Sequence, residues 1–487
     1  MFGNYVYEKS FAAYANKVLL VDEDRLDDAV HYSSVFSAHG FECVKYENDL
    51  MFRIEYEDKL LKTESKIVVI ADSNNYIPYD IRKRFVIYTV SLPQLFPKMN
   101  AGVLREFPEN NLDLLCMAYK ENYDDLTRRS DAERFIREKV YSRSMVSRLL
   151  EYRYAIQHEN ASEITDYRQW FPVAEEKASI DVMAAQYGIE IDTSALNIRF
   201  RDWVLDKYGK LSSVIDQESP ILVSRAMEYM RDHSSKFVII VMDGMSEFDW
   251  NILSASFSDI QYEQAAVFAM IPTVTSVSRQ CLLSNKYPVM LMSPWTQSKE
   301  KSEFWACAKN LGYADNQIAY ERGYDAQFGA FVRCGAVIIN DIDDMVHGQL
   351  QGRTGMYNDV SLLSKQGRLA TLTRRLLHQG FDVYISADHG NTPCTGMGKL
   401  MGTGVETETK SHRMLVLKDF ADKDVLKEKY HLIEFPKYYL MKEFDYLICD
   451  VGTSFDAKNS DVMNHGGITL DEVVVPFIKI KAAVNNE

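Results

Sequence analysis

The sequence contains no run of apolar residues close to the roughly 20 that a membrane-spanning helix needs. Its beginning, MFGNYVYEKSFAAYANK, lacks the basic and then apolar layout of a secretory signal peptide. Its seven cysteines are scattered, odd in number and without a CxxC pair, which predicts reduced, partly buried thiols. These absences predict a soluble, cytoplasmic protein with no membrane partner.

An excess of positive charge is also missing. The 55 lysines and arginines face 70 aspartates and glutamates, so the formal net charge is −15. This balance argues against general adhesion to nucleic acid or anionic membranes, although a local basic groove is compatible with it. At 487 residues the chain exceeds the roughly 250–300 residues that a single core usually reaches. We therefore expect two or three domains, and the sequence leaves an oligomer open.

Changes in periodicity divide the chain into three predicted domains. Residues 1–105 alternate short β-branched runs with helical stretches, which predicts a small α/β domain. Residues 106–233 follow a helical period and predict a helical connector or bundle. Residues 234–487 return to an α/β pattern, which predicts a mostly parallel sheet sandwiched by helices. The strands expected there lie at 237–243, 265–271, 336–341, 382–388, 412–419 and 473–480.

The runs VLLVDED and IVVIAD in the first domain resemble a response-regulator receiver. That resemblance implies that Asp22, Asp24 and Asp72 hold Mg²⁺ or accept a phosphoryl group. No lysine partner follows on a later strand, and a degenerate α/β domain with solvated acidic loop ends is the competing interpretation.

The third domain opens with KFVIIVMDGM, whose five apolar residues at 237–241 predict a strand buried on both faces. Such a strand delivers Asp243 to its carboxyl end, where open parallel sheets collect ligands and metals. Gly244 lets the chain turn away at little steric cost. An aspartate at a strand end can also simply cap the next helix, so the later segments decide its role.

The segment IPTVTSVSR places two threonines before a helix-like run. Thr273 or Thr275 would then lie at a helix N-terminus, where backbone amides and the helix dipole favour a phosphate. A threonine hydroxyl is a poor nucleophile near neutral pH unless a base or a metal lowers its pKa. Plain N-capping is the alternative role for both residues.

Two further segments supply carboxylates and imidazoles. In INDIDDMVHG, Asp343 and His347 are four positions apart, which puts both on one helix face, a pairing that suits zinc. Asp341 and Asp344 compete for the carboxylate role. In ISADHGN, Asp388 and His389 follow a β-branched strand and precede a glycine that permits a turn, so both can reach one metal.

A last histidine, in NHGG, completes two ligand sets. One set contains Asp243, Thr275, Asp388 and His389, and the other contains Asp343, His347 and His465 with an open position. Two divalent ions about 4 Å apart, with zinc preferred, would clamp the attacking and leaving oxygens of a phosphoryl transfer.

This order of residues resembles the alkaline phosphatase superfamily. PTVTSVSR is similar to the PTxT segment of its nucleotide phosphodiesterase branch, which implies that the second threonine, Thr275, attacks phosphorus. The segments DGMS, DDMVHG and HGGITLDEVVVPFIKI resemble the PglZ domain more specifically. From helical spacing alone, Arg279 would face the same side as Thr275 and hold phosphate oxygens.

The resemblance implies a metal-dependent hydrolase of phosphate esters, and it places the chain among proteins of BREX-type phage defence. The expected activity is that of a phosphodiesterase or phosphatase on nucleotide or oligonucleotide substrates, with other defence proteins as partners. The alternative is a scaffold or regulatory subunit of a defence complex that keeps the metal site without turnover.

Overall fold

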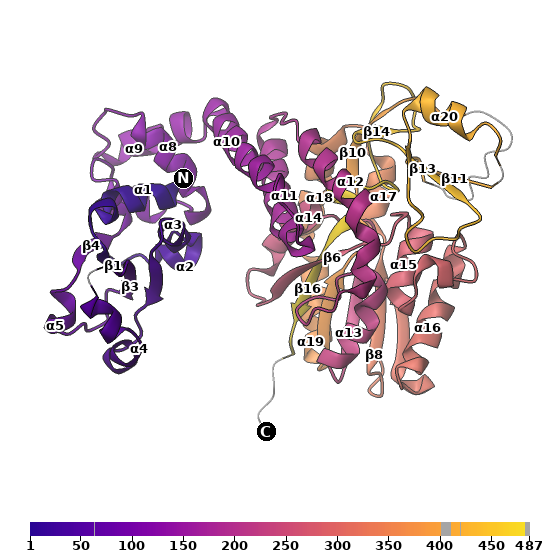
Figure 1. Cartoon of the computed structure of the whole chain (residues 1–487), viewed down its shortest axis with the longest axis horizontal. Coiled ribbons are helices and arrows are strands. Elements are labelled where there is room, and N and C mark those ends of the chain that lie inside the picture. The colour runs from indigo at the N-terminus through magenta and orange to yellow at the C-terminus, as the bar shows by residue number, and fades with distance from the viewer. Residues whose placement is uncertain (63, 401–410, 419, 483–487) are drawn as a thin grey trace. The chain divides into compact units, whose positions relative to one another are not determined.

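The computed structural model describes residues 1–62, 64–400, 411–418 and 420–482 (Figure 1). The chain forms two compact units, Met1–Glu151 and Tyr152–Glu487. Their boundary falls within helix α10 (Arg143–Ala161), so the segment predicted as one helical connector contributes helices to both units. The division into three domains of separate function stays a prediction.

The first unit contains a parallel four-stranded sheet in the order β2-β3-β1-β4. Its strands are β1 (Lys17–Asp22), β2 (Glu42–Lys45), β3 (Ile67–Asp72) and β4 (Val86–Val90). Its longer helices are α1 (Phe2–Lys9), α3 (Ser33–Ala38), α4 (Asp49–Leu61), α8 (Leu112–Lys120) and α9 (Arg129–Phe135). Receiver domains have the order 2-1-3-4-5, with β1 between β2 and β3. The observed order therefore departs from the receiver topology.

The acidic residues of this unit make contacts within the chain. Asp22 is buried and accepts hydrogen bonds from the backbone of Leu26 (3.0 Å) and from the Tyr32 hydroxyl (3.0 Å). Asp24 accepts from the Leu92 backbone N–H at 2.7 Å, and Asp72 pairs with an arginine at the surface. These bonds fit the degenerate α/β interpretation better than a phosphoryl acceptor.

The second unit is built on a six-stranded sheet in the order β6-β16-β9-β5-β8-β7. Its strands are β5 (Phe237–Met242), β6 (Glu263–Phe268), β7 (Ile318–Arg322), β8 (Cys334–Ile339), β9 (Asp382–Ser386) and β16 (Val474–Ile480). Strands β9, β5, β8 and β7 pair in parallel, whereas β16 runs antiparallel to both neighbours. Every residue of β5 is buried, as expected for a strand covered on both faces.

Helices cover this sheet in two groups (Figure 1). Helices α11 (Trp170–Tyr187), α14 (Glu247–Leu253) and α18 (Gly352–Gln366) pack on one another. Helices α13 (Ala226–His233), α15 (Thr275–Ser284) and α16 (Glu300–Asn310) form the second group. The remaining longer helices are α12 (Ser194–Lys207), α17 (Asp341–Gly348), α19 (Arg368–His378) and α20 (Lys423–Tyr430). The predicted fold class, a mostly parallel sheet sandwiched by helices, is confirmed.

One strand expectation needs correction, and one sheet was not predicted. The strand expected at 412–419 is β11 (Met414–Leu417), which lies outside the main sheet and pairs antiparallel with β13 (Asp445–Ile448). A second small sheet, with β10 (Thr392–Gly396) and β15 (Asp461–Asn464), was not predicted. Among the described residues, no helix is both long and apolar enough to span a bilayer.

Candidate metal centre and active site

The parallel strands β9, β5 and β8 are neighbours in the six-stranded sheet, and functional side chains follow their carboxyl ends. Asp243 comes directly after β5, Asp388 comes two residues after β9, and Asp343 lies in the first turn of α17 after β8. Gly244 has φ +74°, and a Cβ there would lie 3.5 Å from the Cβ of Asp343. The tight turn after β5 therefore leaves room for the carboxylate of the next strand.

The first cluster unites Asp243, Asp388 and His389, whose ligand atoms all lie within 4.8 Å of one another. The Nε2 of His389 is 4.0 Å from Asp243 Oδ1 and 3.7 Å from Asp388 Oδ2. The Thr275 hydroxyl oxygen lies 3.1 Å from the same Nε2 and 3.4 Å from Asp243 Oδ1. Four residues from three separate segments thus face one small space.

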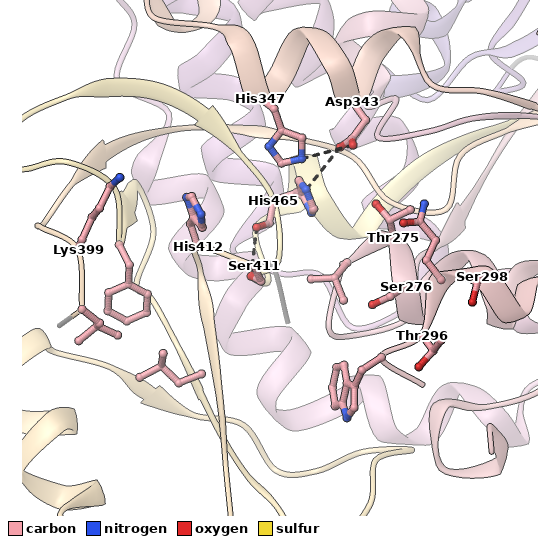
Figure 2. Close-up of a pocket in the computed structure, with 16 residues that line it drawn as sticks. Thr275, Ser276, Thr296, Ser298, Asp343, His347, Lys399, Ser411, His412 and His465 are labelled. Atoms are coloured by element: carbon pink, nitrogen blue, oxygen red, sulfur yellow. Dashed lines mark hydrogen bonds and ion pairs between the residues drawn. The ribbon is translucent and has the colours of Figure 1, made fainter. Parts of the chain in front are cut away.

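The second cluster unites Asp343, His347 and His465, again with ligand atoms within 4.8 Å. The carboxylate of Asp343 lies between the two imidazoles, 3.4 Å from His347 Nε2 and 3.5 Å from His465 Nε2 (Figure 2). The rings of His389 and His465 stack with centroids 4.2 Å apart. The two clusters therefore adjoin.

Backbone carbonyls orient two of the imidazoles. The Nδ1 of His465 lies 2.9 Å from the carbonyl oxygen of Thr273, and the Nδ1 of His389 lies 3.0 Å from that of Gly390. A proton on each Nδ1 makes these hydrogen bonds, which leaves the Nε2 lone pairs facing the clusters. Metal-binding histidines commonly have this arrangement.

The chemistry of the clusters fits divalent metal ions. Asp388 Oδ2, Asp343 Oδ1 and His465 Nε2 are buried and have no hydrogen-bond partner among the described residues. A buried carboxylate oxygen without a partner is costly, and a bound cation removes that cost. Carboxylate oxygens together with imidazole nitrogens form a donor set that zinc accepts.

Burial and neighbouring charges shift the pKa values of these groups. Burial, together with the Asp388 carboxylate beside it, raises the pKa of Asp243 well above its ordinary value. Burial also raises the pKa of Asp388 to about 6. Burial would raise the pKa of Asp343 too, but the hydrogen bond from His347 and the charge of His465 lower it further than burial raises it. Burial and the neighbouring His389 lower the pKa of His465 to about 3.

The two threonines of the PTVT segment have different environments. Thr273 is fully buried, and its hydroxyl donates to the Gly467 carbonyl (2.8 Å) and accepts from the Gly466 N–H (3.0 Å). Thr275 begins helix α15, is partly exposed and lines the adjacent pocket. Of the two hydroxyls, that of Thr275 alone is available to a bound molecule.

Arg279 departs from its expected position. Its side chain is fully buried, and its guanidinium donates to Asp243 Oδ2 and, at 2.6 Å, to Glu300 Oε2. It is absent from the residues that line the pocket. The helical spacing from Thr275 turns this side chain inward behind Asp243. Arg279 was expected to hold phosphate oxygens, but in the structure it pairs with the Asp243 carboxylate.

The competing carboxylates of α17 lie apart from the clusters. Asp341 accepts a hydrogen bond from the Tyr324 hydroxyl at 2.9 Å, and Asp344 is exposed. Neither belongs to a ligand cluster among the described residues. Cys281 and Cys394, which lie near the site in sequence, are buried free thiols whose pKa values burial raises.

A supporting layer behind the first cluster was not predicted. The Asn391 amide donates to the Gly244 carbonyl (2.9 Å) and to Asp249 Oδ2 (2.6 Å). Asp249 also forms a capping box with Ser246 at the start of α14. The Ser-x-x-Asp spacing at 246–249 signals that cap in the sequence, but its bond to Asn391 joins residues 142 positions apart.

A pocket of about 1030 Å³ opens beside the two clusters (Figure 2). One part of its lining carries Thr275, Ser276, Asp343, His347 and His465. Apolar side chains form another part: Val274, Trp295, Leu400, Leu415 and Phe455. Lys399, Ser411 and His412 complete a further wall. The pocket is larger than one phosphate group needs, and its size is typical of sites for drug-sized ligands.

Residues 223–480 match the family described as the BREX system PglZ alkaline phosphatase-like domain. The fold and the site thus define the chain as a member of the alkaline phosphatase superfamily. The match covers more than half of the 487 residues, and the chain belongs to the PglZ family. The predicted family is confirmed.

Three solved structures are similar to about half of the chain. Human ectonucleotide pyrophosphatase/phosphodiesterase 5 is 14% identical over 50% of this chain and 87% of its own, with a TM-score of 0.36. The murine protein in complex with AMP is 12% identical over 51% and 88%, with a TM-score of 0.35. Phosphonoacetate hydrolase from Sinorhizobium meliloti 1021 is 10% identical over 52% and 92%, with a TM-score of 0.33. No curated protein matches.

Proposed function

We propose that the protein is a two-metal phosphodiesterase or phosphatase that hydrolyses nucleotide or oligonucleotide phosphate esters through Thr275. In this proposal Asp243, Thr275, Asp388 and His389 hold one divalent ion, and Asp343, His347 and His465 hold the other. Zinc fits this oxygen and nitrogen donor set best. The PglZ family supports the general activity of a phosphoester hydrolase.

The observation that carries the proposal is the position of the Thr275 hydroxyl. It is 3.1 Å from His389 Nε2 in the first cluster, and it lines the same pocket as Asp343 and His465 of the second cluster. It also begins helix α15, where backbone N–H groups of the first turn lack intrahelical partners and favour a phosphate. A nucleophile, an anion site and a metal donor set therefore share one cavity.

The chemistry requires a threonine oxygen that has lost its proton. Two divalent ions in these clusters would lower the pKa of the Thr275 hydroxyl and offset charge on the phosphoryl group. Thr275 Oγ forms a bond to phosphorus, its hydroxyl proton passes to solvent, and the bond from phosphorus to the leaving oxygen breaks. The leaving oxygen takes up a proton from solvent and departs as an alcohol. Water then hydrolyses the resulting phosphothreonine, releases phosphate or its monoester, and restores the hydroxyl.

Arg279 acts in this proposal as a positioning residue. Its guanidinium pairs with Asp243 on one side and with Glu300 on the other, and the Arg279 and Glu300 side chains are nearly inaccessible to solvent. The pair fixes one carboxylate oxygen of Asp243 and leaves Oδ1 facing Thr275.

A cytoplasmic location and other phage-defence proteins as partners belong to the same proposal, because BREX is the setting of the family.

A hydrolysis panel with metal analysis tests the function. Bis(p-nitrophenyl) phosphate and p-nitrophenyl phosphate are offered to zinc-loaded wild type, Thr275→Ala and Asp388→Ala. We expect Thr275→Ala to keep its metal, because Asp243, Asp388 and His389 remain as ligands of the first ion, and to lose turnover at least about a hundredfold. Asp388→Ala should lose both metal and turnover. Thr371→Ala, which removes an exposed hydroxyl on α19, serves as the matched control.

The same panel separates the enzyme from a scaffold that merely retains metal. Full metal content without turnover of any monoester or diester by the wild type would favour the scaffold. Full turnover by Thr275→Ala would refute the nucleophile and leave the metal site standing.

A further inference from the structure

The pocket beside the metal clusters has a second polar wall with no part in the proposed chemistry. His412 and Lys399 line it, and Figure 2 shows both on the side away from Thr275 and Ser276, with His465 between the two sides. The His412 side chain is about half exposed. Lys399 is exposed and has no ion pair within the part of the chain that the structure describes. This wall therefore presents two nitrogen groups to the cavity.

His412 is held by a carboxylate that is itself fixed. Its Nδ1 lies 2.6 Å from Asp456 Oδ1, and the Asp456 side chain is 15% exposed. The other Asp456 oxygen accepts hydrogen bonds from Ser454 Oγ and from the Asn464 amide, both at 2.7 Å. Burial raises the pKa of Asp456, but the hydrogen bonds from His412 and Ser454 lower it further, so an ionised carboxylate fixes the His412 ring through Nδ1.

The same network ties this wall to the metal clusters. Asn464 donates to Asp456 with its amide nitrogen and accepts, with its carbonyl oxygen, from the backbone N–H of His465 at 2.8 Å. Ser411 Oγ donates to the His465 carbonyl at 3.4 Å, and a Cβ on Gly466 would lie 1.9 Å from that Oγ. The segment that carries His412 therefore has a fixed position relative to a candidate metal ligand.

The space between the two walls is lined by apolar side chains. Trp295, Leu415 and Phe455 lie in this lining, together with Val274 and Leu400. Aromatic side chains provide flat apolar surface against which a nucleobase can stack. The cavity thus offers an anion site at the metal clusters, a second wall with the Lys399 ammonium and the His412 ring nitrogens, and apolar surface besides.

We propose that His412 and Lys399 form a subsite for a second phosphate group of the substrate. The inference rests on the proposed function for the first phosphate, which the metal clusters would hold. A nucleoside unit with phosphates on both its 3′ and 5′ oxygens presents two anions on one apolar body, which is the condition of an internal unit of an oligonucleotide. The protein therefore acts on oligonucleotides in preference to isolated mononucleotide esters.

Binding to a variant without the nucleophile tests the subsite independently of turnover. Zinc-loaded Thr275→Ala is titrated calorimetrically with thymidine 5′-monophosphate and with thymidine 3′,5′-bisphosphate. We expect the bisphosphate to bind about tenfold more tightly or better, since one charge-assisted contact accounts for a factor of this size. Adding His412→Gln or Lys399→Gln should remove most of that advantage and leave the affinity for the monophosphate within about twofold.

Two further variants distinguish recognition from loop support. His412→Arg keeps a nitrogen donor at this position and should keep most of the advantage. If His412 only supported the loop, its substitution would weaken the binding of both ligands equally. His378→Gln changes an exposed histidine on α19 and is the matched control. The proposal is overturned if the bisphosphate binds no more tightly than the monophosphate or shows no binding, or if its advantage survives in the His412→Gln/Lys399→Gln double variant. A retained advantage without turnover by the wild type would contradict the proposed hydrolase and not the subsite.

Discussion

At the scale of single residues, the two threonines of the PTVT segment lie two positions apart and have different contacts. Thr273 uses its hydroxyl for both Gly466 and Gly467, and its carbonyl accepts from His465 Nδ1. It therefore organises the turn that carries a candidate metal ligand. Thr275 has its hydroxyl directed at the first cluster and the pocket. Spacing alone left both residues open, because each could cap a helix, and the resemblance to the PTxT segment favoured Thr275.

This contrast predicts opposite effects for the same substitution. Thr273→Val leaves the Gly466 N–H and the Gly467 carbonyl without partners, so the free energy of unfolding should fall by about 1–3 kcal/mol. Thr275→Val should change that free energy by less than about 0.5 kcal/mol and abolish turnover. Urea unfolding followed by circular dichroism, with a chromogenic ester assay on each variant, measures both quantities.

Serine substitutions at the same positions are the control for the two valine variants. Thr273→Ser keeps the hydroxyl and should recover most of the stability. Equal stability of Thr273→Val and Thr275→Val would show that the hydrogen bonds to the glycine turn contribute little.

At the scale of elements, a buried charge network lies behind the Asp388–His389 turn. Lys177 on α11 donates to Asp181 and to Asp471, each at 2.7 Å, and Asp471 belongs to the short helix α21 (Leu470–Val473). A Cβ on Gly390 would lie 1.9 Å from the Asp471 carbonyl oxygen, so α21 packs directly against the turn. The network thus fixes the element on which a metal ligand pair rests.

Removing Lys177 should destabilise the protein in a pH-dependent way. Lys177→Met leaves two buried carboxylates with Arg353 as their remaining cation, and such a broken pair costs about 3 kcal/mol near neutral pH. Burial would raise the pKa of Asp471, but Lys177 and Arg353 lower it to about 2 in the folded protein. An ordinary aspartate has a pKa of about 3.9. The stabilisation that ionised Asp471 contributes is therefore complete above about pH 4 and is lost as the pH falls through about 2.

Urea unfolding of wild type and Lys177→Met at several pH values between 5 and 2.5 checks this expectation. The difference between the two proteins should be largest at pH 5 and should shrink on acidification. Lys365→Met, which changes an exposed lysine on α18, should follow the wild type at every pH. A difference that stays constant down to pH 2.5 would show that the charge of Asp471 is not what Lys177 stabilises.

The elements that sequence could predict are those with a strong local pattern. Strands β5 and β9 are β-branched runs that end before an aspartate, and both were predicted, as was helical structure over 106–233. Strand β7 was missed because IAYER ends in two charged, exposed residues and lies at the sheet edge. Bonds such as Asn391 to Asp249, or Asn464 to Asp456, were also missed because no periodicity marks partners that meet only through the fold.

At the scale of the whole molecule, the unit that carries both ligand clusters begins earlier than the change of periodicity at 234 indicates. The second compact unit starts at Tyr152, and α11 and α12 share its core. The rings of Trp170, Phe200 and Trp203 contact one another, and Trp203 stacks on Phe268 of β6 with centroids 5.5 Å apart. These helices are therefore part of the sheet's own packing.

Two truncated chains test this boundary. A chain of residues 152–487 should unfold cooperatively and bind zinc, because both ligand clusters and the Lys177 network lie within it. A chain of residues 234–487 lacks three buried large aromatic side chains, each worth about 3–5 kcal/mol, and this loss is as large as the whole stability of a typical domain. Calorimetry and metal analysis compare them with the full chain. Cooperative unfolding of the shorter chain would support the predicted boundary at 234 instead.

Metal removal should make the stability of the whole molecule fall as the pH rises. In the metal-free protein burial raises the pKa of Asp388 to about 6 and that of Asp243 well above its ordinary value. Between the unfolded value near 3.9 and the folded value, the folded chain binds more protons than the unfolded chain. The free energy of unfolding therefore decreases with rising pH, by about 1.4 kcal/mol per pH unit for each such carboxyl.

Bound metal keeps both carboxylates ionised and removes this slope, so the difference in melting temperature between zinc-loaded and EDTA-treated protein should be larger at pH 8 than at pH 5. Asp388→Asn, which cannot ionise, should flatten the dependence of the metal-free melting temperature on pH. A metal-free melting temperature that rises from pH 5 to pH 8 would contradict the burial of unpaired carboxylates at the carboxyl ends of the strands.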